Sequence, residues 1–250
     1  MIPKPCKVTV LIPTSFAPSH PSIVLVRTAV CSVRRVLSLP STRILVCCDG
    51  PPRDADARER YEEYKARLKA FAPTEGSTVV ERSTHGGLPG VLLEGFQWID
   101  TPLVLVFQHD FEVVRSIDVT KVCETLLRDD LQVKHLRLNH RTTRPIKSDF
   151  VLKPYEHPKA PLPLLRTSSW SDMPHFARTS YYRERVLPLI RASSGRLGVE
   201  NRLGPLLLAD IDRLGFDTAH PLHGTFLYGR LGDPPIVRHL DGRRRKPIDG

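Results

Sequence analysis

Four short apolar segments separated by helical patterns constrain the fold of this chain more than any other feature of its sequence. They span residues 7–12, 43–48, 77–82 and 103–108. Most of their residues are apolar or β-branched, which is typical of strands buried on both faces of a sheet. Strands of this kind that alternate with helices belong to α/β proteins. The sequence therefore predicts a mostly parallel sheet flanked by helices.

The segments between these strands have the spacing of amphipathic helices. Apolar side chains recur every three or four positions in residues 23–37 and again in residues 57–71. After the third strand, Pro89 suits the first turn of another helix, which carries its apolar stripe as far as Ile99. The first half of the chain thus predicts a regular alternation of strands and helices.

The second half is less regular. It predicts a helix near residues 118–128, a strand at 133–138 and a helix from about Pro205. Between them, residues 144–168 are rich in Pro, Lys and Arg and predict a long loop, a candidate lid. We find no repeat and no linker, so we expect one domain. We divide it into residues 7–115, residues 116–240 and a basic tail, 241–250.

Composition and charge narrow the classes of function. The 250 residues carry 37 basic and 27 acidic side chains, a net charge of +10, which favours an anionic partner. Aromatic residues are only 7% and do not alternate with basic ones, so we expect no nucleic-acid partner. The five scattered cysteines argue against a disulfide framework. Without a signal peptide or an apolar run of about 18 residues, we expect a cytoplasmic protein with no transmembrane segment.

Three polar clusters directly follow predicted strands. They are Pro13-Thr14-Ser15, Cys48-Asp49-Gly50 and Gln108-His109-Asp110. The carboxyl ends of parallel strands meet at one edge of the sheet, where open α/β sheets bind their ligands. Gly86 and Gly87 open a helix at the same edge, and a helix N-terminus favours an anion. Alternative roles remain open, since Asp49-Gly50 is also a good turn sequence and Asp110 also suits a cap.

Taken in order, these elements resemble those of a GT-A-fold nucleotide-sugar glycosyltransferase, similar to the inverting glycosyltransferase family two. The first strand of such enzymes reads V-x-V-x-I-P, as in residues 8–13, and the second ends in an Asp, matched by Asp49. GGLPGVLLEGFQWIDTP leads into LVLVFQHDFEV, which occupies the position of the apolar strand and Asp-x-Asp motif. The resemblance covers roughly residues 7–115.

The resemblance implies a single Rossmann-like domain that takes a nucleotide-sugar donor, most simply a UDP-sugar. Thr14, Ser15 and Asp49 would hold the base and ribose. The complete set of implied donor-binding residues is Pro13, Thr14, Ser15, Asp49, Gly86, Gly87 and His109. A divalent cation would be held by Asp110 with His109 and the late His223, and Glu112 is a further candidate. Because His109 stands in the Asp-x-Asp motif, Mn²⁺ is favoured over Mg²⁺.

Inverting transfer also needs a general base to deprotonate the acceptor hydroxyl. The resemblance implies Glu200 for this role, and Asp172 is the rival. The acceptor would be a glycan or glycoprotein, contacted by Trp170, Ser171 and His175 in the less regular half of the chain. Three other functions remain open: a nucleotidyltransferase, a catalytically inactive relative, and a nucleic-acid-binding module.

Overall fold

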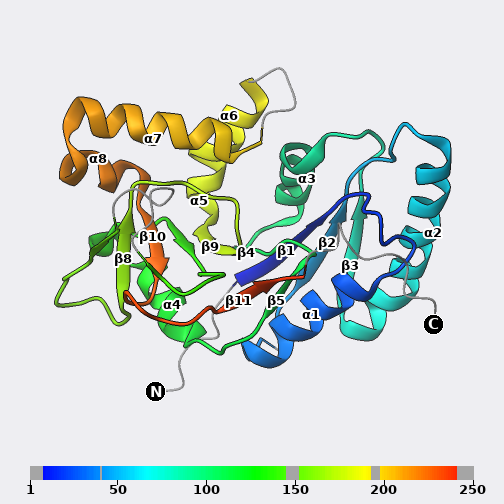
Figure 1. Cartoon of the computed structure of the whole chain (residues 1–250), viewed down its shortest axis with the longest axis horizontal. Coiled ribbons are helices and arrows are strands. Elements are labelled where there is room, and N and C mark those ends of the chain that lie inside the picture. The colour runs from blue at the N-terminus through cyan, green and yellow to red at the C-terminus, as the bar shows by residue number, and fades with distance from the viewer. Residues whose placement is uncertain (1–7, 40, 145–151, 193–197, 241–250) are drawn as a thin grey trace.

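The computed structural model describes residues 8–39, 41–144, 152–192 and 198–240 of the chain, so the predicted basic tail lies outside the described residues. Its helices and strands follow one another along the chain as Figure 1 shows. In order they are β1 Val8–Thr14, α1 Val24–Val36, β2 Ile44–Cys48, α2 Ala55–Phe71, β3 Ser77–Glu81, α3 Gly87–Gly95, β4 Leu103–Val106, β5 Phe111–Val113, α4 Val119–Leu127, β6 His135–Arg137, β7 Leu152–Pro154, β8 Leu164–Thr167, β9 His175–Arg178, α5 Thr179–Tyr181, α6 Leu187–Ala192, α7 Glu200–Leu214, α8 Phe216–His223, β10 Thr225–Tyr228 and β11 Val237–His239.

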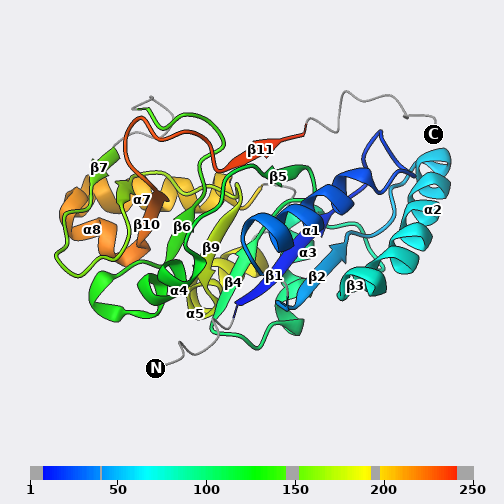
Figure 2. The same cartoon turned by 90° about the horizontal axis from the view of Figure 1, so that it is seen from below.

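A nine-stranded sheet forms the centre of the described chain, in the order β3-β2-β1-β4-β9-β6-β10-β8-β7. Figure 2 shows the strands spread in this order across the molecule. The pairings β3·β2, β2·β1 and β1·β4 are parallel, and so is β6·β10. Strands β9 and β8 run against the others. The predicted mostly parallel α/β fold is confirmed.

The alternation of side chains along β1 explains the layers on either side of the sheet. Val10 and Ile12 belong to an apolar cluster that contains residues of α1, α2 and α4, whereas Leu11 belongs to a second cluster with residues of α3, α6 and α7. Successive residues of a strand point to opposite faces, so a strand that is apolar throughout must be covered on both. The core therefore consists of two layers that the sheet separates.

The predicted long loop at residues 144–168 is wrong in part. Residues 145–151 lie outside the described residues, but β7 and β8 pair as an antiparallel hairpin that extends the sheet. The composition concealed these strands because Lys153 and Pro154 lie on β7, the edge strand, and an edge strand tolerates both residue types. The described part of this segment is therefore not a lid.

Two further expectations concern the cysteines and the membrane. Cys47 and Cys48 are free and fully buried, as small residues of the core, and Cys31 is also free. Cys123 is disulfide-bonded, a single bond that the expectation of no disulfide framework did not address. Among the described helices, none combines the length and the apolar character that crossing a bilayer requires.

Candidate functional site

Asp49 holds the glycine turn at the start of α3. Its side chain is 0% exposed, and its two carboxylate oxygens accept hydrogen bonds from the backbone N–H groups of Gly86 and Gly87, both at 2.9 Å. The His85 Nδ1 lies 2.8 Å from the same carboxylate. Gly87 has φ of +61°, a left-handed conformation that favours glycine. A carboxylate at a helix N-terminus also interacts favourably with the helix dipole.

The burial of Asp49 corrects its predicted role. A side chain with no exposed surface, whose oxygens already accept two N–H groups, cannot also contact a ribose. Thr14 is corrected for the same reason: it is 2% exposed, and its Oγ1 lies 2.9 Å from the Tyr64 hydroxyl of α2. Pro13 is buried as well, and half-buried Ser15 is the polar residue of this cluster that solvent reaches. Thr14 and Asp49 are therefore buried residues that support the carboxyl ends of β1 and β2.

The end of β4 lies against the end of β1. The His109 Nδ1 is 3.3 Å from the Pro13 carbonyl oxygen, and both His109 and Asp110 are half-buried. Strand register places Thr14 beside Cys48, directly before Asp49. The predicted meeting of these clusters at one sheet edge is therefore present in the structure.

His239 is a residue that sequence reasoning missed. Its Nε2 lies 3.1 Å from the Asp110 Oδ2, and the Leu240 N–H donates to the Asp110 carbonyl at 2.7 Å. The small sheet of β5 and β11 brings the two together by pairing Phe111 with His239. The contact joins positions 129 residues apart, and no local pattern marks β11 as the partner of β5. Nothing in the sequence alone could have singled out His239.

His223, the late histidine that the resemblance implied, lies at the opposite edge of the sheet. Gly224 separates it from β10, whose first residue pairs with His135 at the amino end of β6. Asp110, in contrast, follows the carboxyl end of β4. The four residues of β4 alone span roughly 13 Å. The prediction that His223 and Asp110 share a cation is therefore wrong. His223 instead pairs with Asp210, 2.9 Å away.

The two rival bases come together in the structure. Asp172 lies just before β9, and Glu200 is the first residue of α7. Burial, followed by the charge of the adjacent Glu200 carboxyl and a hydrogen bond with it, raises the pKa of Asp172 to about 6. The Ser171 hydroxyl donates to Glu200 Oε2 at 3.3 Å. The Gln108 side-chain amide donates to the Asp172 carbonyl, so the pair lies beside the end of β4.

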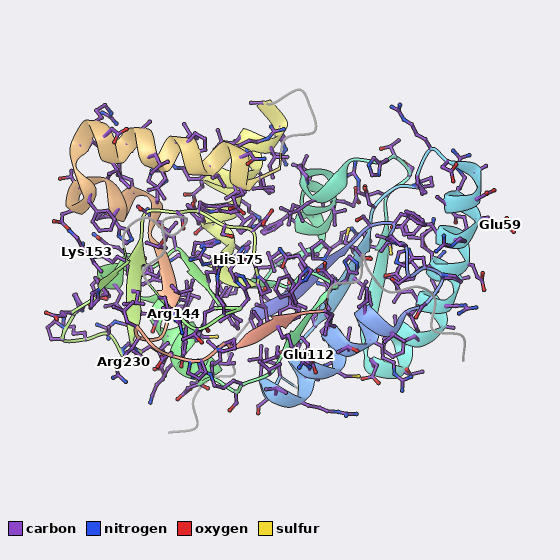
Figure 3. All side chains as sticks on the ribbon, viewed as in Figure 1. Glu59, Glu112, Arg144, Lys153, His175 and Arg230 are labelled. Carbon is purple, nitrogen blue, oxygen red and sulfur yellow. The ribbon has the colours of Figure 1, made fainter. Side chains whose placement is uncertain are left out.

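Trp170 and His175 lie beneath this pair rather than at the surface. Trp170 is 1% and His175 0% exposed, and Figure 3 shows His175 inside the molecule. The His175 ring stacks on Tyr182 and its two nitrogens lie 2.6 Å from the Met173 carbonyl and the Tyr182 hydroxyl. Burial lowers the pKa of His175 to about 4, so the ring is neutral. The prediction that Trp170 and His175 contact the acceptor is therefore wrong.

One sheet edge thus carries three groups in a fixed order. The glycine turn lies at β2 and α3, His109 and Asp110 lie at β4, and the carboxyl pair lies at the start of β9. In the described residues no three His, Cys, Asp or Glu side chains are placed to hold an ion by themselves. The edge carries a glycine turn closed by Asp49, an Asp–His pair and a carboxyl group with a raised pKa.

Solved structures share this fold at low identity. The mannosyltransferase PcManGT from Pyrobaculum calidifontis, in complex with GDP-Man and Mn²⁺, is 10% identical with a TM-score of 0.51 and covers 90% of this chain and 55% of its own. S. aureus TarS is 11% identical with a TM-score of 0.51, and the match covers 93% of this chain and 36% of TarS. A cytidylyltransferase from Leptospira borgpetersenii is 9% identical with a TM-score of 0.50, and the match covers 92% of this chain and 77% of the cytidylyltransferase.

These likenesses establish a Rossmann-like α/β fold of the kind that nucleotide-dependent transferases use. The chain spans about half the length of the mannosyltransferase and about a third of TarS. No protein-family model matches the sequence, and no curated protein matches it either. The particular family named by the sequence resemblance is therefore not established.

Proposed function

We propose that this protein is a glycosyltransferase that moves a sugar from a nucleotide-sugar donor to an acceptor hydroxyl. The observation that carries the proposal is the Asp172–Glu200 pair, a carboxyl group with a raised pKa at the edge where α/β sheets bind their ligands. The fold supports it, since the mannosyltransferase with this fold is in complex with GDP-Man. The donor diphosphate would lie between the glycine turn and β4, in reach of the half-buried Ser15.

Asp172 is the proposed general base. A base must accept a proton from the acceptor hydroxyl at the operating pH, and a carboxylate whose pKa is near 6 is a stronger base than an ordinary aspartate. Burial is the main cause of this raised pKa, and the negative charge of the exposed Glu200 adds to it. Asp172 would take the proton of the acceptor hydroxyl while the acceptor oxygen bonds to the anomeric carbon and the bond from that carbon to the diphosphate breaks. A single displacement of this kind inverts the configuration of the sugar carbon, which is the outcome we propose.

Asp110 and His239 fit a divalent cation. They offer one carboxylate and one imidazole, and cations that serve phosphate substrates are commonly held by one or two side chains with phosphate oxygens completing the shell. An imidazole ligand favours Mn²⁺ over Mg²⁺. When bound, such an ion would neutralise the charge of the departing diphosphate. His109, close by at the end of β4, is a further candidate ligand.

Asp110→Asn and His239→Gln should each weaken Mn²⁺-dependent binding of UDP or GDP by about tenfold or more. The reason is that each removes one of two protein ligands, while neither side chain is in the core. Calorimetric titration with and without Mn²⁺ measures the effect. His157→Gln, a histidine of the β7–β8 connection, is the control and should bind as the wild type does. Equal Mn²⁺ dependence in all four proteins would remove the pair from the cation site.

The rate of transfer should increase with pH through a midpoint near 6. The sign follows from the chemistry, since the pKa of Asp172 is raised to about 6 and only its ionised form accepts a proton. Glu200→Gln should shift this midpoint to lower pH, because it removes the charge that opposes ionisation of Asp172. The profile of kcat/KM from pH 4.5 to 8 measures both. A midpoint that stays in place in Glu200→Gln would contradict the assignment.

Calorimetric binding of nucleoside diphosphates, followed by hydrolysis assays with UDP-sugars and GDP-sugars, tests the function as a whole. Failure of every nucleoside diphosphate to bind, with or without Mn²⁺, would end the proposal.

A nucleotidyltransferase is the second candidate, because the cytidylyltransferase has the same fold over 92% of this chain. It ranks lower, since the loop after β1 reads SFAPSH and lacks a glycine-rich turn with a basic residue. Release of pyrophosphate from CTP would favour it.

A further inference from the structure

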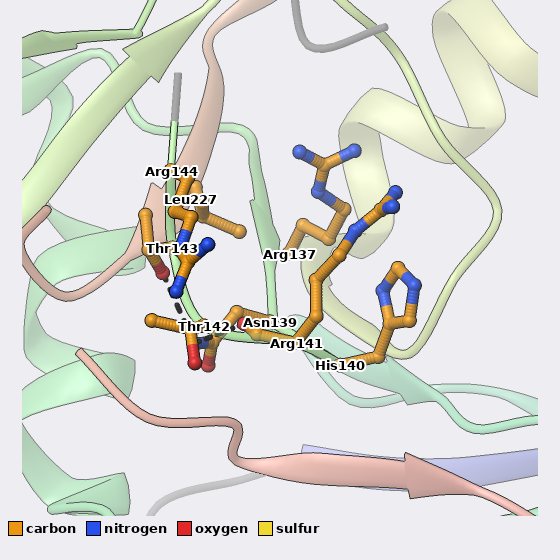
Figure 4. A pocket seen from close by; sticks show the side chains of 8 residues that line it. All are labelled: Arg137, Asn139, His140, Arg141, Thr142, Thr143, Arg144 and Leu227. Atoms are coloured by element: carbon orange, nitrogen blue, oxygen red, sulfur yellow. Dashed lines mark hydrogen bonds between the residues drawn. The ribbon is translucent and has the colours of Figure 1, made fainter. Parts of the chain in front are cut away.

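A pocket lined by three arginines lies at the same sheet edge as the carboxyl pair. Its walls come from the end of β6, the segment that follows it and the end of β10, as Figure 4 shows. The lining residues are Arg137, Asn139, His140, Arg141, Thr142, Thr143, Arg144 and Leu227. No Asp or Glu is among them. We call this the arginine pocket.

The backbone of the arginine pocket is firmly held. The Asn139 side-chain amide donates to the Thr143 hydroxyl at 3.0 Å and to the Pro234 carbonyl at 2.9 Å, and its oxygen accepts from the Ile236 N–H at 3.1 Å. Asn139 is 4% exposed, so these bonds are shielded from water. They tie the segment after β6 to the segment before β11. Arg141 and Arg144 thus extend, exposed, from a braced backbone.

Two of the three arginines of the pocket extend together, and Arg144 lies apart from them beside Leu227. Figure 4 shows the guanidinium groups of Arg137 and Arg141 extended to the same side, next to the His140 ring. Figure 3 shows Arg144 with Lys153 and Arg230 on the half of the molecule built from β7, β8 and β10, so this half adds further positive charge. Arginine presents a planar fork of donors that matches phosphate oxygens. Three arginines around one pocket favour a multiply charged anion over a single carboxylate.

The size of the pocket points to one small group. Its volume is about 70 Å³. A cavity needs at least roughly 10–15 Å³ to hold one water, so this pocket exceeds that minimum several-fold and suits a small polyatomic ion. A whole sugar or nucleoside needs more space than this. The pocket therefore suits a phosphate whose attached molecule extends outward along the edge.

The order of strands places this pocket on the acceptor side. The proposed donor groups lie at β2, β1 and β4, the carboxyl pair lies at the start of β9, and the pocket lies beyond it at β6 and β10. Arg137 pairs with His175 across β6 and β9, and the Leu138 N–H donates to the Pro174 carbonyl at 2.9 Å. The pocket is thus next to the segment that carries Asp172, on the side away from the donor.

We propose that the arginine pocket binds a phosphate group of the acceptor, so that a hydroxyl of the same molecule reaches the Asp172–Glu200 pair. The inference rests on the proposed function and adds the class of acceptor, a phosphorylated sugar or a glycan that carries phosphate. Binding at a distance from the reacting hydroxyl orients the acceptor before reaction.

Inorganic phosphate and glucose 6-phosphate are the probes, titrated calorimetrically at constant ionic strength in the presence of saturating UDP and Mn²⁺. We expect Arg141→Gln/Arg144→Gln to bind both at least about tenfold more weakly than the wild type, since each arginine contributes charge-assisted hydrogen bonds. The matched control is Arg27→Gln/Arg35→Gln, which removes the same charge from exposed positions of α1. Glucose without phosphate should not bind measurably.

The outcomes separate this inference from the proposed function. If phosphate binds the double variant as it binds the wild type, or if acetate binds as tightly as phosphate, the inference is wrong while UDP binding can stand. If UDP displaces phosphate from the wild type, the pocket belongs to the donor and the inference is also wrong. If inorganic phosphate binds but glucose 6-phosphate does not, the pocket takes a free ion and not an acceptor. Failure of nucleoside diphosphates to bind at all contradicts the proposed function instead.

Discussion

Asp172→Asn is expected to reduce the rate of sugar transfer by about 10²–10⁴-fold, the contribution typical of a general base. Asparagine has nearly the same shape and can still accept and donate hydrogen bonds, but it cannot take a proton from the acceptor. Donor binding should change little, because Asp172 lies on the acceptor side of β4. The measurement is kcat against KM for the donor under saturating acceptor.

The same substitution should stabilise the protein at neutral pH. The pKa of Asp172 is raised from 3.8 to about 6, so its contribution to stability is fully present below pH 3.8 and is lost as pH rises through 6. Above pH 6 the buried charge therefore opposes folding, and a neutral asparagine removes that cost. We expect the free energy of unfolding to increase on the order of 1–2 kcal/mol at pH 7.5, with little change at pH 4.

A surface aspartate provides the control for both effects. Asp100 is 84% exposed and makes a single long contact, 3.7 Å, with Arg43. Asp100→Asn should leave both the rate and the unfolding curve unchanged. If Asp172→Asn retains full activity, the base lies elsewhere, and Glu200→Gln becomes the variant to test. If it destabilises the protein at pH 7.5, Asp172 has a structural role that its burial and raised pKa do not reveal.

Asp49→Ala is expected to lower the free energy of unfolding by about 3 kcal/mol or more and to abolish donor binding with it. The substitution removes the acceptor of the Gly86 and Gly87 N–H groups. It also removes the nearer of the two carboxylates beside Arg82, whose Nε lies 3.7 Å from Asp49. Removing one partner of a buried ionic group is strongly destabilising. Urea unfolding and calorimetric titration with UDP measure the two losses.

Asp54→Ala is the matched comparison for Asp49→Ala. Asp54 caps α2 by accepting the Ala57 N–H at 2.9 Å, but it is exposed, so its loss should cost only about 1 kcal/mol. A larger loss in Asp49→Ala shows that burial, and not helix capping alone, accounts for the effect. If Asp49→Ala instead folds as stably as the wild type and only raises the donor KM, Asp49 contacts the nucleoside, as the sequence resemblance implied.

The fold was largely predictable because buried strands and helices can be identified in the sequence from apolar runs and from regularly spaced apolar residues. The first four strands and the helices between them occur where apolar runs and helical spacing predicted them, as at β4 and α1. The hairpin of β7 and β8 was not predictable in this way. An edge strand needs few apolar residues, so Lys153 and Pro154 resemble a loop until the strand is paired.

The site was predictable in position but not in role. The rule that ligands bind at the carboxyl ends of parallel strands correctly brought Asp49, Gly86 and His109 to one edge. It could not say that Asp49 and Thr14 turn inward, because the direction of a side chain after a strand depends on what packs against it. The same limit explains why Trp170 and His175, which are close to Asp172 in the sequence, lie beneath the Asp172–Glu200 pair.

The sequence by itself determined the sheet, its helical layers and the edge where polar residues gather, since these follow from periodicity and from the geometry of parallel strands. Only the tertiary structure decided which of those residues solvent can reach and which distant ones join them. Pairing of β5 with β11 brings His239 to Asp110, packing of α7 brings Glu200 to Asp172, and the Asn139 bonds hold the arginine pocket. Such contacts depend on the distance between atoms in space, which spacing along a chain does not encode.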